Sequence, residues 1–101
     1  MSLQGKVAIV TGSGRGLGLA YARELARQGA AVVVNDVDAA VAEEAAATIT
    51  ADGGRAVAVV APVGSTETAR ALVGAAVENF GGLDILVTNA GVLRDKSLLK
   101  M

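Results

Sequence analysis

Residues suited to binding a phosphate lie close to the start of this 101-residue chain. The apolar run Val7–Val10 leads into Thr11 and then into glycines at positions 12, 14, 16 and 18, after which apolar residues recur at helical spacing. Glycines let the backbone turn tightly and approach a ligand, and the backbone N–H groups that begin a helix favour an anion. The candidate contacts in this loop are Gly12, Ser13, Gly14, Arg15, Gly16, Leu17 and Gly18.

The spacing of the glycines distinguishes between kinds of phosphate site. The pattern G-x-G-x-x-G does not fit, because leucine stands where its third glycine is required. The pattern T-G-x-x-x-G-x-G fits, and it assigns the tight turn to Gly12, the approach to a pyrophosphate to Gly16 and close helix–strand packing to Gly18. A glycine-rich turn without a ligand is the alternative, but so many glycines carry a heavy entropic cost in a plain connection.

An acidic residue after the second apolar run would select the nucleotide. Asp36 follows Gly18 by eighteen residues, and a carboxylate there can accept hydrogen bonds from both hydroxyls of an adenosine ribose while repelling a 2′-phosphate. Arg15 acts in the opposite direction, since a cation beside the loop could pair with a 2′-phosphate. Asp36 could instead cap a turn or helix, but Asp38 competes for that role and is placed to cap the helix predicted over residues 39–51. We expect NAD as the cofactor, with NADP as the less favoured one.

Positioning these groups requires a particular order of strands and helices. Apolar runs predict four strands, at residues 6–11, 30–35, 56–61 and 83–88, and the first two of them are expected to be buried on both faces. Apolar residues at helical spacing predict three helices, over residues 17–28, 39–51 and 66–80. Right-handed crossovers then make a Rossmann-type, doubly wound α/β sheet of about four parallel strands, in the order 3-2-1-4 with helices on both faces. Tyr21, Val73 and Val77 belong to the apolar faces of their helices, so we expect them in the core.

The fourth strand of this order would lie at an open edge of the sheet. We expect residues 1–91 to form an NAD(P)-binding Rossmann half-domain and residues 92–101 to form a loop and the start of a further helix, the chain being the truncated N-terminal portion of a longer protein. An apolar edge, and a sheet face that later helices would cover, favour self-association. We therefore expect a homo-oligomer.

Composition excludes several other classes of protein. The formal net charge of -1 argues against a nucleic-acid partner. The chain has no cysteine and no histidine, so we expect no disulfide, no thiol nucleophile and no metal site. Hydrophobic residues make up 52% and the mean hydropathy is +0.52, which suits a buried core. No apolar run reaches the roughly 18 residues of a membrane span, and we expect a cytoplasmic protein without a membrane partner.

A third motif, Asn89-Ala90-Gly91, follows the fourth predicted strand and reaches the same edge of the sheet as the glycine loop. Together with Thr11–Gly18, Asn35-Asp36-Val37 and residues 81–87, it makes essentially the whole chain resemble the short-chain dehydrogenase/reductase family. The resemblance implies an NAD(P)-dependent oxidoreductase that exchanges a hydride with a small-molecule substrate, a secondary alcohol or ketone. Residues 91–101 are similar to those of members acting on 3-hydroxyacyl or 3-oxoacyl thioesters.

The resemblance also implies roles for individual residues. Asp36 would bind the adenosine ribose, Asn89 would order the site beside the nicotinamide ribose, and Asp84 would be structural. Members of the family carry Asp or Asn before a valine after the third strand, where this chain has Pro62. Proline supplies neither an acceptor side chain nor an N–H, so this adenine contact would be weakened. The remaining candidate cofactor contacts are Val37, Pro62, Val63, Ala90 and Gly91.

The catalytic serine and the Tyr-x-x-x-Lys pair of the family have no counterpart in this chain. Tyr21 is the sole tyrosine, and Leu25 stands where the lysine would follow it. Without an acid or base to move the hydroxyl proton, hydride transfer would be very slow. We therefore expect no catalytic residue here and no activity from the chain alone.

Two other functions compete with the dehydrogenase interpretation. A chain that ends naturally at Met101 could be a non-catalytic nucleotide-binding or regulatory module. A methyltransferase dependent on S-adenosylmethionine would share the doubly wound fold, a glycine loop and an acidic residue after the second strand. The T-G-x-x-x-G-x-G spacing and Asn89-Ala90-Gly91 speak against the methyltransferase.

Overall fold

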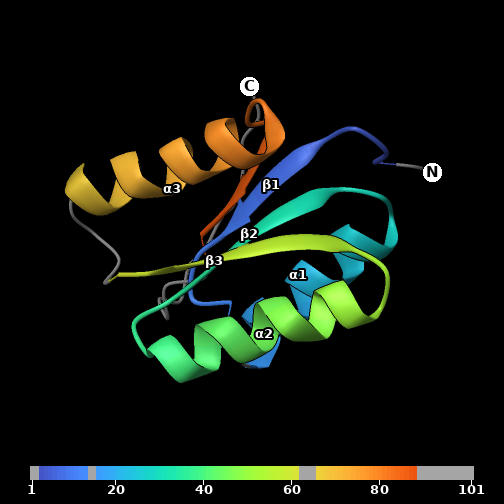
Figure 1. Cartoon of the computed structure of the whole chain (residues 1–101), viewed down its shortest axis with the longest axis horizontal. Coiled ribbons are helices and arrows are strands. Elements are labelled where there is room, and N and C mark those ends of the chain that lie inside the picture. The colour runs from blue at the N-terminus through green and yellow to red at the C-terminus, as the bar shows by residue number, and fades with distance from the viewer. Residues whose placement is uncertain (1–2, 14–15, 62–65, 89–101) are drawn as a thin grey trace.

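A computed structural model describes residues 3–13, 16–61 and 66–88, and strands and helices alternate strictly along them (Figure 1). Strand bounds differ slightly from the prediction, since the first and last strands are shorter and the third begins at Arg55. In chain order, the elements are β1 (Val7–Val10), α1 (Gly16–Arg27), β2 (Ala31–Asp36), α2 (Ala39–Ala51), β3 (Arg55–Val60), α3 (Thr66–Phe80) and β4 (Ile85–Val87).

The four strands form one parallel sheet in the order β3-β2-β1-β4, which confirms the predicted topology. Val10 of β1 lies opposite Val34 of β2 and Val87 of β4. Asp36 lies opposite Val60 where β2 pairs with β3. Because all the strands run the same way, their carboxyl ends share one edge of the sheet. The glycine loop after β1 and the acidic end of β2 therefore emerge side by side.

Helices cover both faces of the sheet, α1 and α2 on one side and α3 on the other (Figure 1). Successive strand residues point to opposite faces, so the sheet divides the core into two layers. The layer under α3 contains the buried residues Val7, Ile9, Ala31, Val33, Leu72 and Ala76. The layer under α1 and α2 contains Val10, Ala22, Val32, Val34, Ala45 and Ile49.

Tyr21 does not lie in the core, contrary to the prediction. Its side chain is 44% exposed on α1, where Gly18 and Ala22 are the buried residues. Ala22 follows Tyr21 by one position, which is about 100° around the helix axis. Leu19, Leu25 and Ala26 are partly buried against the same layer as Ala22, whereas Tyr21 is turned aside from it.

The apolar stripe of α3 is also narrower than predicted. Thr68, Leu72 and Ala76 are buried and repeat every four residues. Val73 and Val77, one position further on, are 42% and 50% exposed. Both valines were expected in the core. They instead form an exposed apolar strip along the side of α3. The helix itself contacts β1, β2 and β3.

Candidate functional site

Two glycines of the loop after β1 have a backbone conformation that favours glycine. Gly12 and Gly16 both have a φ of +61°, in the left-handed region that strains residues with a side chain. Helix α1 begins at Gly16, and a Cβ added to that residue would meet no atom of residues 3–13, 16–61 or 66–88 within 4 Å. Gly18 is buried in the same helix. Within the part of the chain that the structure describes, the start of α1 is therefore open to an approaching ligand, while Gly18 packs inward.

Hydrogen bonds tie this loop to the strands on both sides of β1. The N–H of Thr11 donates to the carbonyl of Val87 in β4 at 3.0 Å. On the other side, the N–H of Ser13 donates to the carbonyl of Asn35 in β2 at 2.7 Å. The Ser13 hydroxyl donates to the carbonyl of Val10 at 2.6 Å and accepts from the N–H of Asn35 at 2.9 Å. Ser13 thus extends the connection between β1 and β2 beyond the last ladder pair.

Asn35 is fully buried at the end of β2, and its side chain reaches across the sheet edge. Its Oδ1 accepts from the N–H of Gly12 at 3.3 Å. Its Nδ2 donates to the carbonyls of Val59 and Ala61, each at 3.1 Å. Sequence reasoning placed Asn35 only within a family pattern and assigned it no role. The sequence did carry a signal for this role, because a polar side chain at the end of a buried apolar strand must find hydrogen-bond partners.

Asp36 and Asp38 have different positions in the structure, and only one of them caps a helix. Asp38 caps α2, since its Oδ1 accepts from the N–H groups of Ala40 at 3.0 Å and Val41 at 3.3 Å. Asp36 is the last residue of β2 and is half-buried, and its Oδ1 accepts from the N–H of Asp38 at 3.2 Å. A carboxylate that does not cap the helix therefore stands at the sheet edge. Val37 beside it is 64% exposed.

Seven of the predicted contacts fall among the described residues, and the structure brings them to one edge of the sheet. Leu17 lies in the first turn of α1 and is 60% exposed. The other six are Gly12, Ser13, Gly16, Gly18, Asp36 and Val37. Seven further predictions lie outside the described residues, namely Gly14, Arg15, Pro62, Val63, Asn89, Ala90 and Gly91.

Asp84 lies at the opposite end of the sheet from the glycine loop. Its Oδ2 accepts from the N–H of Val7 at 2.9 Å, and its own N–H donates to the carbonyl of Val7 at 2.8 Å. These bonds join the segment before β4 to the first residue of β1. This geometry fits the structural role that the family resemblance implied for Asp84.

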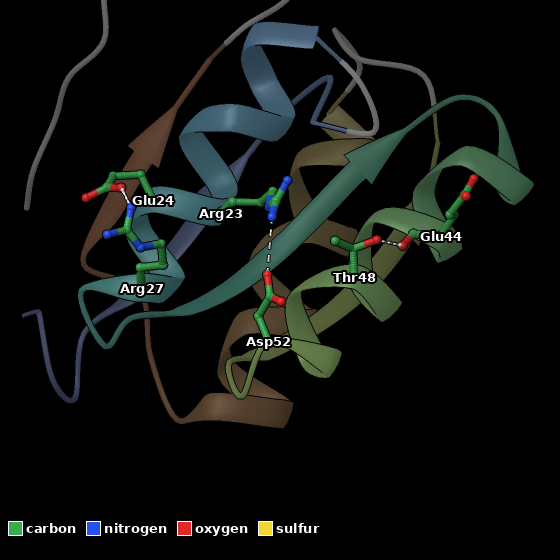
Figure 2. Close-up of polar contacts among 6 residues, drawn as sticks. All are labelled: Arg23, Glu24, Arg27, Glu44, Thr48 and Asp52. Carbon is green, nitrogen blue, oxygen red and sulfur yellow. Dashed lines mark hydrogen bonds and ion pairs between the residues drawn. The ribbon is translucent and has the colours of Figure 1, made fainter.

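A cavity of about 440 Å³ also lies at that opposite end, between the last turns of α1 and α2. Arg23, Arg27 and Arg55 line it. Arg23 pairs with Asp52 at 3.4 Å and so bridges the two helices, while Arg27 pairs with Glu24 of its own helix at 2.6 Å (Figure 2). Because both pairs are exposed, each contributes at most about 1 kcal/mol. The cavity is separate from the predicted phosphate site.

The backbone of that cavity offers little to an anion. The N–H groups of Gly29, Gly53 and Gly54 donate to carbonyls at the ends of α1 and α2. Helix C-termini also carry partial negative charge, which the arginines offset.

Among residues 3–13, 16–61 and 66–88, no group of three or more histidine, cysteine, aspartate or glutamate side chains is placed to hold a metal ion. No helix in the same part of the chain is long and apolar enough to cross a membrane.

Comparison with known proteins agrees with the site geometry. Residues 6–101 match the family model for short chain dehydrogenases. An uncharacterised oxidoreductase of Methylorubrum extorquens is 54% identical over 91 residues, covering 89% of this chain and 37% of that protein. A hydroxyacyl-CoA dehydrogenase of Mycobacterium tuberculosis is 49% identical over 104 residues, covering 98% of this chain and 32% of that protein.

Solved structures give the same result. A short chain dehydrogenase from Mycobacterium avium superposes with a TM-score of 0.84 at 42% identity, covering 97% of this chain and 38% of the other. A hydroxysteroid dehydrogenase from Escherichia coli gives 0.85 at 41% identity, covering 90% and 39%. The chain spans 32–37% of the length of the two relatives and 38–39% of the two structures. With the glycine loop, the sheet order and the matched residues in agreement, the chain belongs to the short-chain dehydrogenase family.

Proposed function

We propose that this chain is the dinucleotide-binding part of an NAD(P)-dependent oxidoreductase acting on a secondary alcohol or ketone. One observation carries the proposal: the Ser13 N–H donates to the Asn35 carbonyl at 2.7 Å, so the glycine loop lies beside the strand end that carries Asp36. A dinucleotide needs a phosphate cradle and a ribose acceptor on adjacent strands. We assign residues 1–91 to this half-domain and residues 92–101 to the start of the next element.

The residues present fit such a cofactor. The open side of Gly16 and the N–H groups of the first turn of α1 suit a pyrophosphate. The Asp36 carboxylate suits the ribose hydroxyls of adenosine and disfavours a 2′-phosphate, so we propose NAD in preference to NADP. The exposed side chains of Leu17 and Val37 supply apolar surface at the same edge. When bound, the nicotinamide would supply the hydride acceptor or donor.

The substrate and the acid–base chemistry require residues beyond those assigned here. We propose that the chain alone is inactive, since hydride transfer at an alcohol needs a group that accepts the hydroxyl proton. For the longer enzyme we propose a 3-hydroxyacyl or 3-oxoacyl thioester as substrate. The name of the Mycobacterium tuberculosis relative, a hydroxyacyl-CoA dehydrogenase, supports this class, whereas a 48% identical relative from Azotobacter vinelandii is an L-rhamnose 1-dehydrogenase. We further propose a cytoplasmic homo-oligomer.

Titration with NADH tests the cofactor assignment directly. We expect a protein-dependent change in NADH fluorescence that ADP-ribose reverses by competition. NADPH should bind more weakly than NADH, and replacing Asp36 with alanine should narrow that difference. If the chain leaves NADH fluorescence unchanged at concentrations up to the millimolar range, the proposal is refuted.

The alternative of a non-catalytic nucleotide-binding module shares this binding result. The two are separated by the reading frame after Met101 in the gene. A serine followed by Tyr-x-x-x-Lys would support the oxidoreductase, and a stop codon would support the module.

A further inference from the structure

We propose that Asn35 is a positioning residue for the cofactor: its side chain holds the glycine loop and the end of β3 in register, and thereby sets the affinity for the diphosphate of the dinucleotide. This inference rests on the proposed function. It concerns a buried residue that would not itself touch the ligand. Its action would pass through the backbone of Gly12 and Ser13.

Three segments that the cofactor would contact meet at this one side chain. Oδ1 holds the N–H of Gly12 in the glycine loop at 3.3 Å. Nδ2 holds the carbonyls of Val59 and Ala61 at the end of β3, both at 3.1 Å. Asp36, the proposed ribose acceptor, is the next residue along the chain. The side-chain amide of Asn35 therefore links the glycine loop to the end of β3, and it lies next in the chain to the proposed ribose acceptor.

An amide is the side-chain group that satisfies this set of partners. The N–H of Gly12 requires an acceptor, whereas the two carbonyls require donors, and a primary amide carries both. A carboxylate of the same shape would retain the acceptor and present negative charge to two carbonyl oxygens. A leucine of similar size would leave all three backbone groups without this partner, at a site that is fully buried.

Backbone bonds to Asn35 complete the attachment of the loop. The Ser13 N–H donates to the Asn35 carbonyl at 2.7 Å, and the Asn35 N–H donates to the Ser13 hydroxyl at 2.9 Å. The peptide units of Gly12 and Ser13 are therefore held before any ligand arrives. A loop that is ordered in advance loses less conformational entropy on binding. Loss of the side-chain bonds should consequently weaken binding even where the fold survives.

The experiment compares Asn35→Ala and the milder Asn35→Ser with a control of matched instability. Leu72→Ala serves as the control, because Leu72 is buried on the α3 side of the sheet, away from the loop. Each full chain is first shown to be folded by circular dichroism at low temperature. Dissociation constants are then measured for NADH and ADP-ribose at that temperature.

The positioning role predicts a separation of affinity from stability. We expect both Asn35 variants to bind NADH and ADP-ribose more weakly, by about tenfold for Asn35→Ala. Leu72→Ala should lower the melting temperature at least as much and bind within twofold of the wild type. If a folded Asn35 variant binds as the wild type does, or if Leu72→Ala weakens binding equally, the positioning role is overturned.

Amide hydrogen exchange provides a readout without ligand and keeps the two proposals distinguishable. The Gly12 and Ser13 amides should exchange faster in Asn35→Ser than in the wild type, while the amides of Val32 and Val33 in the middle of β2 keep their protection. Unchanged exchange at Gly12 and Ser13 would refute the positioning role even if NADH binds. A wild-type chain that binds neither ligand would instead refute the proposed function, and the positioning role with it.

Discussion

Replacing Asp38 with alanine should mainly destabilise α2, whereas replacing Asp36 with alanine should mainly weaken cofactor binding. Asp38 is the N-cap of α2, and its Oδ1 accepts two backbone N–H groups, at 3.0 and 3.3 Å. Losing an N-cap costs about 1 kcal/mol, which corresponds to a fall in melting temperature of about 4–8 °C for a domain of this size. Asp38→Ala should therefore melt earlier and bind NADH as the wild type does.

Asp36→Ala should show the converse behaviour. Its Oδ1 accepts from the N–H of Asp38 at 3.2 Å. Because Asp36 is partly exposed, water competes for its hydrogen bonds, so its contribution to stability should stay below about 1 kcal/mol. As the proposed ribose acceptor it would form hydrogen bonds with a charged partner, worth about 1.5–3 kcal/mol. That range corresponds to a roughly 10- to 150-fold rise in the dissociation constant of NADH.

Thermal unfolding and NADH titration of both variants decide the matter. The expected result is that each variant changes mainly one of the two measured quantities, the melting temperature or the NADH dissociation constant. It is refuted if Asp36→Ala lowers the melting temperature as much as Asp38→Ala while leaving NADH affinity intact, because Asp36 would then be a structural residue. It is also refuted if Asp38→Ala weakens NADH binding as strongly as Asp36→Ala does.

Three further predictions concern the scaffold. Gly54→Ala should destabilise the chain by about 1–3 kcal/mol in urea denaturation, because its Cβ would stand 2.9 Å from Ile49 Cγ2 and 3.2 Å from Ala26 Cβ; an unchanged midpoint would contradict this close approach. Gly74→Ala in α3 should stabilise the chain by about 0.5–1 kcal/mol by the same measurement, since an added Cβ there meets none of the described residues within 4 Å; a lower midpoint would contradict the prediction. Val73→Gln combined with Val77→Gln should reduce self-association in sedimentation velocity, because both valines are exposed; an unchanged association constant would show that another surface mediates it.

Much of the fold could be predicted because its signals are local. The valine-rich runs at Val7–Val10 and Ala31–Val34 are apolar without alternation, as strands buried on both faces require. Asp38 was predicted as a cap, and the structure confirms it. The strand order followed from crossover handedness and was also confirmed.

Which side chains of a helix are buried was harder to predict, because an apolar residue can lie on the side of the helix that faces solvent. On α1 the residues that pack inward are Gly18 and Ala22, and Tyr21 is turned outward. On α3 the same geometry exposes Val73 and Val77. Which apolar side chains become buried depends on how each helix is oriented on the sheet beneath it.

The sequence by itself determined the alternation of strands and helices, the glycine-rich turn between β1 and α1, and the presence of a carboxylate at the end of β2. Each of these depends on residues close together in the chain. Only the tertiary structure decided that the Asn35 side chain joins the glycine loop to the end of β3. Hydrogen bonds between segments more than twenty residues apart depend on how the strands are placed side by side, and local sequence does not encode that geometry.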